Sequence, residues 1–160
     1  PRECVEDLQA MLGYARSISK DISLFGCSLG AYFAMLAYKD EPLGKALFLS
    51  PVVDMQSIIQ NMMGWFGISE EQLEREGAIA TPAKTLYWDY YQYVANHPVE
   101  WAKPTALLYG SGDTLCEYEV VNHFAKRFHA DLTVMEEGEH YFHTEPQLAF
   151  YRQWLRGHLD

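Results

Sequence analysis

The chain has 160 residues, of which 49% are hydrophobic, enough for one domain with a single core. Its 22 acidic residues outnumber 12 basic ones and give a net charge of −10, which argues against nucleic acid and anionic membranes as partners. No apolar run approaches the roughly 20 residues that span a bilayer, and the first residues lack a signal-peptide pattern. Three cysteines cannot all pair within one chain, so we expect free thiols and a cytoplasmic protein.

Helical and strand patterns alternate along most of the chain. In order, they predict a helix over 5–18, a strand over 21–25, a helix over 30–38, a strand over 45–49, a strand over 105–109, a helix over 118–128, a strand over 131–135 and a helix from Thr144. The strand patterns are apolar throughout, which is typical of a parallel sheet covered on both faces. The sequence therefore predicts an α/β domain with a parallel sheet of about four strands and flanking helices.

The stretch 55–101 interrupts this alternation. It contains no convincing strand but several helix signals, including a capping box at Ser69 and Gln72 and Pro82 at a helix start after a threonine. We interpret it as a helical cap inserted within a single domain over 1–160.

A Gly-x-Ser-x-Gly pattern lies over residues 26–30, between a predicted strand and a predicted helix. A serine at the apex of such a tight turn needs small neighbours two residues away on either side, because larger side chains would collide with the strand and helix. The hydroxyl of Ser28 would then stand clear of the sheet. The backbone N–H of Leu29, at the positive end of the helix, would point to where an oxyanion forms.

A nucleophilic serine needs a base, and the base needs an orienting acid. Asp113 follows the third predicted strand and His140 follows the fourth. With Ser28 after the first, all three follow the carboxyl ends of parallel strands, which lie at one edge of a sheet. Asp54, which also follows a strand, is the alternative acid, and His143 is the alternative base; we favour Asp113 and His140.

Three segments together resemble the α/β-hydrolase family, over nearly all of the chain. They are Ile22 to Ala31, Pro104 to Asp113 and Glu137 to His143. The resemblance implies Ser28 as nucleophile, His140 as general base and then acid, Asp113 as its orienting carboxylate, and Leu29 as one backbone oxyanion donor. It also implies that 55–101 is a lid over the site.

The chain departs from this family at its start. Family members carry several strands and a helix ahead of the segment with which this chain begins. We therefore expect a partial, N-terminally truncated α/β-hydrolase fold that lacks the loop usually supplying the second oxyanion donor. The strand over 21–25 would keep an unpaired edge, through which the chain can associate with a second copy or with a missing N-terminal portion.

These observations predict a serine hydrolase that acts on small-molecule esters or related acyl substrates, with no metal or organic cofactor. The alternatives are peptidase or acyltransferase chemistry on the same triad, and a non-catalytic binding module. The spacing of His140 and His143 does not match a zinc motif. Cys27 is expected to be a buried structural thiol. The aromatic run over 87–93 either packs within the cap or forms a wall for an apolar substrate group.

Overall fold

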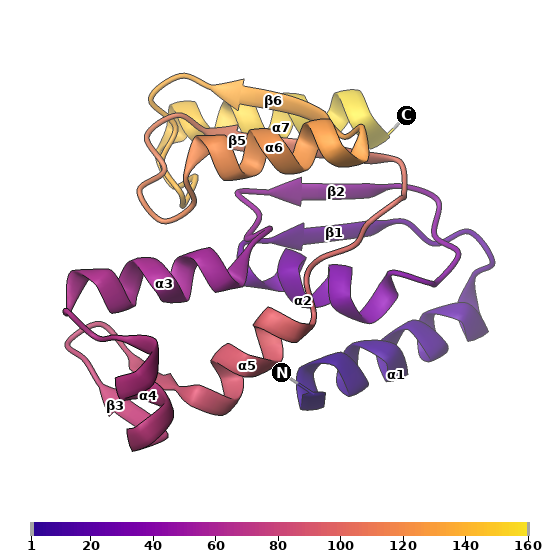
Figure 1. The fold of residues 1–160 in the computed structure, drawn as a ribbon. Coiled ribbons are helices and arrows are strands. Elements are labelled where there is room, and N and C mark those ends of the chain that lie inside the picture. Colours follow the sequence, from indigo (N-terminus) through magenta and orange to yellow (C-terminus); the bar gives the residue numbers. More distant parts are fainter. Residues whose placement is uncertain (1, 160) are drawn as a thin grey trace.

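The structure is a computed structural model that describes residues 2–159. Four parallel strands form one sheet in the order β1-β2-β5-β6 (Figure 1). They are β1 (Leu24–Cys27), β2 (Ala46–Leu49), β5 (Thr105–Gly110) and β6 (Asp131–Met135). The predicted α/β architecture is confirmed, and β1 is an edge strand that, among the described residues, pairs only with β2.

Seven helices occur within the described residues. They are α1 (Arg2–Ile18), α2 (Leu29–Tyr38), α3 (Met55–Trp65), α4 (Glu70–Glu76), α5 (Trp88–Asn96), α6 (Tyr118–Phe128) and α7 (Glu145–Leu159). None of the helices in this part of the chain is long and apolar enough to cross a membrane.

Helices cover both faces of the sheet, with α2 and α6 on one face and α7 on the other (Figure 1). Side chains along a strand alternate between the two faces. In β2, Phe48 therefore joins the core on the α2 side, while Leu47 packs with Trp154 of α7. Because both faces are covered, every residue of β2 and β5 is buried, which explains their continuously apolar sequences.

The predicted apolar face of the first helix is only partly correct. Leu12 is buried, but Met11 is 64% exposed and Ile18 is 70% exposed. The helix α1 packs mainly against α2, so only part of its apolar surface is covered.

The insertion between β2 and β5 is not entirely helical. It also contains a two-stranded antiparallel hairpin of β3 (Ala78–Ala80) and β4 (Thr85–Tyr87), where no strand was predicted. The helix start predicted at Thr81 and Pro82 is wrong. The Thr81 hydroxyl donates to the Lys84 carbonyl at 2.6 Å and accepts from the Lys84 N–H at 3.0 Å, which closes the hairpin turn. Only the serine half of the capping box predicted at Ser69 and Gln72 is seen. The Ser69 hydroxyl accepts from the N–H of Gln72 at 3.1 Å, whereas the Gln72 side-chain amide donates to Glu76 at 3.2 Å.

Residues of the insertion join the main core rather than forming a separate one. The Trp101 ring lies 5.8 Å from that of Phe48 on β2, and Tyr91 of α5 is 2% exposed. The Tyr91 hydroxyl donates to Glu70 and accepts from the Gln60 amide at 3.0 Å. This part of the aromatic run over 87–93 therefore packs within the fold.

Candidate active site

Ser28 occupies the turn that connects β1 to α2. Its backbone has φ 50° and ψ −123°, a conformation that a residue with a side chain adopts only under strain. Hydrogen bonds to the β2 side hold the turn: the Ser28 N–H donates to the Leu49 carbonyl at 3.0 Å, and the Val52 N–H donates to the Ser28 carbonyl at 3.2 Å. Such a fixed turn holds the serine side chain above the sheet edge.

The two glycines of the motif differ in their surroundings. A Cβ on Gly26 would lie 3.0 Å from the Ala31 Cα and 3.1 Å from a ring carbon of Phe48. Only glycine lets the strand pass this close to α2. At Gly30, by contrast, a Cβ would meet no described atom within 4 Å beyond its chain neighbours and the adjoining backbone of α2. The expectation that crowding requires both glycines is therefore wrong for Gly30.

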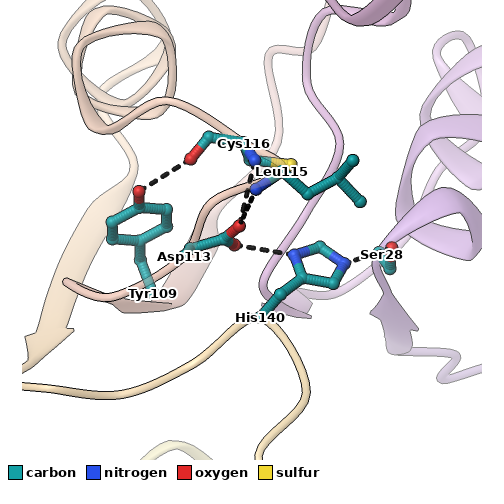
Figure 2. A network of polar contacts seen from close by, with 6 residues as sticks. All are labelled: Ser28, Tyr109, Asp113, Leu115, Cys116 and His140. Carbon is teal, nitrogen blue, oxygen red and sulfur yellow. Dashed lines mark hydrogen bonds and ion pairs between the residues drawn. The ribbon is translucent and has the colours of Figure 1, made fainter.

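The three side chains expected from the sequence lie in hydrogen-bonding contact (Figure 2). The Ser28 Oγ lies 2.8 Å from His140 Nε2, and His140 Nδ1 lies 2.7 Å from Asp113 Oδ2. An ionised carboxylate only accepts hydrogen bonds, so Nδ1 donates to Asp113 and Nε2 is left to accept from the serine hydroxyl. His140 is only 7% exposed, and the Asp113 carboxylate can offset the cost of a charge on this buried ring, so the arrangement can take up a proton from the serine.

The loop after β5 holds the Asp113 carboxylate from its other side. Its Oδ1 accepts from the backbone N–H groups of Leu115 at 2.8 Å and Cys116 at 2.9 Å. The Tyr109 hydroxyl donates to the Cys116 carbonyl at 2.7 Å and ties this loop to β5 (Figure 2). Each carboxylate oxygen thus has its own donors, which fixes the direction in which Asp113 faces the imidazole.

The alternative candidates make other contacts. Asp54 is the N-cap of α3, where its Oδ1 accepts from the Ser57 N–H at 3.0 Å. His143 is exposed, and its Nδ1 lies 3.2 Å from a carboxylate oxygen of Glu139. Cys27 is exposed rather than buried, because it ends the edge strand β1.

The loops that carry Asp113 and His140 are in contact through two glycines. A Cβ on Gly110 would overlap the carbonyl oxygen of Gly138 and lie 2.9 Å from its Cα. The Gly112 N–H donates to that same Gly138 carbonyl at 2.8 Å. The Glu137 N–H also donates to the Ser111 hydroxyl at 2.8 Å. The spacing between Asp113 and His140 therefore depends on a contact that only glycine permits.

Leu29 is the first residue of α2, and its side chain is 39% exposed. The first N–H groups of a helix have no acceptor within the helix and lie at its positive end. The backbone of Leu29, next to Ser28, is thus placed to donate to a developing negative charge. No second donor of this kind is assigned among the described residues.

Sequence reasoning missed Cys116. Its Sγ lies within 4.8 Å of a carboxylate oxygen of Asp113 and a ring nitrogen of His140, and the three side chains together could hold a metal ion. The pKa of the Cys116 thiol is raised to about 12, mainly by burial and to a lesser extent by the nearby negative charge of Asp113. The thiol is therefore neutral near pH 7. The sequence does place Cys116 three residues after Asp113, and this short spacing could have indicated that it lies near the site.

Comparisons with known proteins rest on structure rather than sequence. No family model matches the chain, and no curated protein matches it. Among solved structures, alpha/beta hydrolase domain-containing protein 10 from mouse aligns with a TM-score of 0.72 at 16% identity, over 98% of this chain and 69% of that one. Est1E from Butyrivibrio proteoclasticus, bound to ferulic acid, aligns at 0.74 with 20% identity, over 95% and 66%.

An alpha-beta serine hydrolase homologue from Coxiella burnetii aligns with a TM-score of 0.62 at 21% identity, over 98% of this chain and 58% of that one. The chain thus spans between 58% and 69% of the length of these three structures. Together these likenesses show that the chain has the fold of the α/β hydrolases.

Proposed function

We propose that this chain carries the catalytic residues of a serine hydrolase that acts on small-molecule esters or related acyl compounds. The observation that carries the proposal is the continuous hydrogen-bonded series from Ser28 through His140 to Asp113. Its first member stands on a strained turn at the carboxyl edge of a parallel sheet.

The proposed reaction has two halves. The Ser28 oxygen attacks the acyl carbonyl while His140 Nε2 takes the hydroxyl proton, and His140 then gives that proton to the leaving alcohol. Water, activated by the same imidazole, cleaves the acyl-enzyme and regenerates the serine. Asp113 stabilises the imidazolium through its 2.7 Å bond to Nδ1, and the N–H of Leu29 stabilises the oxyanion.

The insertion over 55–101 is proposed to act as the cap that shapes the acyl site. Support comes from α3, where the Asn61 amide donates to the Glu117 carboxylate at 2.9 Å. Glu117 directly follows the loop that holds Asp113. The ferulic acid bound to Est1E is a carboxylic acid, which is the kind of product that ester hydrolysis releases, and this fits the substrate class proposed for this chain.

Two further properties belong to this proposal. The unpaired edge of β1, with Phe25 46% exposed, favours association through this strand, with a second copy or with a further part of the protein. Light scattering of the purified protein tests this association. If the protein expressed from the full-length reading frame is a monomer at all concentrations, self-association is contradicted.

A cytoplasmic location is favoured by three free cysteines.

A fluorophosphonate probe tests the nucleophile directly. Treatment followed by mass spectrometry of peptides should place the adduct on Ser28, and Ser28→Ala should abolish labelling. Ser17→Ala, which removes an exposed serine hydroxyl from α1, is the matched control and should label like the parent protein. An adduct on another residue, or no labelling of the full-length protein, would overturn the assignment.

A further inference from the structure

The thiol of Cys116 lies beside the acid and the base of the candidate triad, yet the proposed reaction does not use it. Its Sγ, a carboxylate oxygen of Asp113 and a ring nitrogen of His140 all lie within 4.8 Å of one another. The ring nitrogen on this side is Nδ1, which lies 2.7 Å from Asp113, because Nε2 faces Ser28 (Figure 2). All three side chains are buried, so protein atoms rather than water surround the cluster.

A thiol, an imidazole and a carboxylate are a typical ligand set for Zn²⁺ and related thiophilic cations. The bond lengths of a tetrahedral zinc site, about 2.0–2.3 Å, place its ligand atoms roughly 3.3–3.6 Å apart. The 2.7 Å contact between His140 Nδ1 and Asp113 Oδ2 would therefore open by roughly 0.6 Å, and the distances to Sγ, now at most 4.8 Å, would close by roughly 1.3 Å or less. Changes of this size need side-chain adjustment but no rearrangement of the backbone.

A small cavity gives a cation a route to the thiol. It has a volume of about 10 Å³, room for about one water molecule, and lies between α3, α6 and the loop after β5. Cys116 lines it, the other polar lining residues are Asp54, Ser57, Asn61 and Glu117, and the remaining ones are aliphatic. Since Glu117 is exposed, the lining reaches the surface. Two carboxylates without a lysine or arginine in this lining attract a cation and repel anions.

We propose that Asp113, Cys116 and His140 form an inhibitory site for a thiophilic divalent cation of the zinc group. Bonds form from the cation to the sulfur, to Nδ1 and to a carboxylate oxygen, which leaves a fourth position for water. The thiol releases its proton to solvent. The proton on Nδ1 is displaced and Nε2 gains one, so the imidazole stays neutral. The thiolate and the carboxylate balance the two charges of the cation, and a neutral unit suits a buried place.

The changed position of the ring proton accounts for the inhibition. With a hydrogen on Nε2, His140 donates towards Ser28 and no longer accepts its hydroxyl proton. The serine then loses its general base while its turn stays intact. This consequence rests on the proposed function, whereas binding of the cation does not.

Binding is measured with Cd²⁺, whose bond to a thiolate gives an ultraviolet charge-transfer band. The test protein carries Cys4→Ser and Cys27→Ser, which remove both exposed thiols and leave Cys116 as its single cysteine. Titration should give a saturable band with one ion per chain. The added change His140→Ala keeps the thiol and should raise the dissociation constant at least about tenfold, since even the partners of metal ligands contribute that much. Absence of the band, or an unchanged dissociation constant in His140→Ala, would overturn the proposal.

Inhibition is measured by fluorophosphonate labelling, with each protein compared with itself without metal. At a Cd²⁺ concentration about tenfold above the dissociation constant, about nine-tenths of the test protein is occupied, so labelling should slow about tenfold and recover with EDTA. Mg²⁺, which prefers oxygen ligands, should not slow it. When Cys116→Ala is added, Cd²⁺ should leave the labelling rate unchanged; Cys116→Val, which keeps more of the buried volume, repeats the test.

Two results would overturn the inhibition. One is slowing by Cd²⁺ that persists in both Cys116 variants, and the other is equal slowing by Mg²⁺. Circular dichroism checks that each variant is folded. If the test protein is not labelled even without metal, the proposed function fails, whereas the Cd²⁺ band still reports on the metal site.

Discussion

Replacement of Gly110 by alanine tests how the acid and base loops are held together. The new Cβ would meet the backbone of Gly138, including its Cα at 2.9 Å, and backbone atoms cannot rotate away as a side chain can. Overpacking of this kind costs about 1–3 kcal/mol. Separation of the loops would also weaken the 2.8 Å bond from Gly112 to Gly138, worth about 1 kcal/mol. We therefore expect Gly110→Ala to lower the free energy of unfolding by about 3 kcal/mol.

Urea denaturation followed by tryptophan fluorescence measures this loss as a lower midpoint at an unchanged slope. Fluorophosphonate labelling of the folded fraction should slow as well, because His140 follows Gly138 closely and would move relative to Asp113. The matched control is Gly13→Ala, at an exposed position within α1 where the new Cβ would meet no described atom within 4 Å beyond its chain neighbours and the adjoining backbone of α1. That change should stabilise the protein by about 0.5–1 kcal/mol. A Gly110→Ala protein within about 0.5 kcal/mol of the parent would refute the reasoning.

Two further outcomes are expected. At pH 8, a disulfide reagent that releases a chromophore should modify Cys4 first and Cys27 second. Cys27 is exposed as a residue, but neighbouring atoms partly desolvate its thiol and raise the pKa of that thiol. Cys116 should react only after unfolding, and three rapid reactions would contradict this prediction. The pKa values of Cys116 and Tyr109 are raised from 9.0 and 10.0 to about 12, mainly by burial. The folded state therefore keeps protons that the unfolded state releases, so the free energy of unfolding should fall between about pH 9 and pH 12, and urea midpoints that stay constant over that range would contradict it.

The two central strands of the sheet, β2 and β5, could be predicted because they are apolar on both faces. Leu47 and Phe48 point to opposite sides of β2, yet both are buried, so the sequence reads as a continuous apolar run. The convergence of Ser28, Asp113 and His140 followed from the same topology, since residues after parallel strands meet at one edge. The closeness of these three residues in space could thus be inferred without knowledge of the loop conformations.

What could not be predicted depends on neighbours that are distant in the sequence. Thr81 followed by proline suits a helix start as well as a turn, and the pairing of β3 with β4 decides between them. Met11 has the spacing of a core residue but stays exposed because no described element covers it. The contact between Gly110 and Gly138 joins two loops, so neither glycine reveals it alone.

Ser28 follows an edge strand, but the hydrogen bonds that hold its turn lie away from the free edge of that strand. The hydrogen bonds that anchor its turn to the sheet come from Leu49 and Val52, on the β2 side. The opposite edge of β1 carries none of these anchors. A strand added there would enlarge the sheet and cover Phe25 while leaving the hydrogen bonds that hold Ser28 in place. Gain or loss of a partner at this edge can therefore change the quaternary structure without rebuilding the turn.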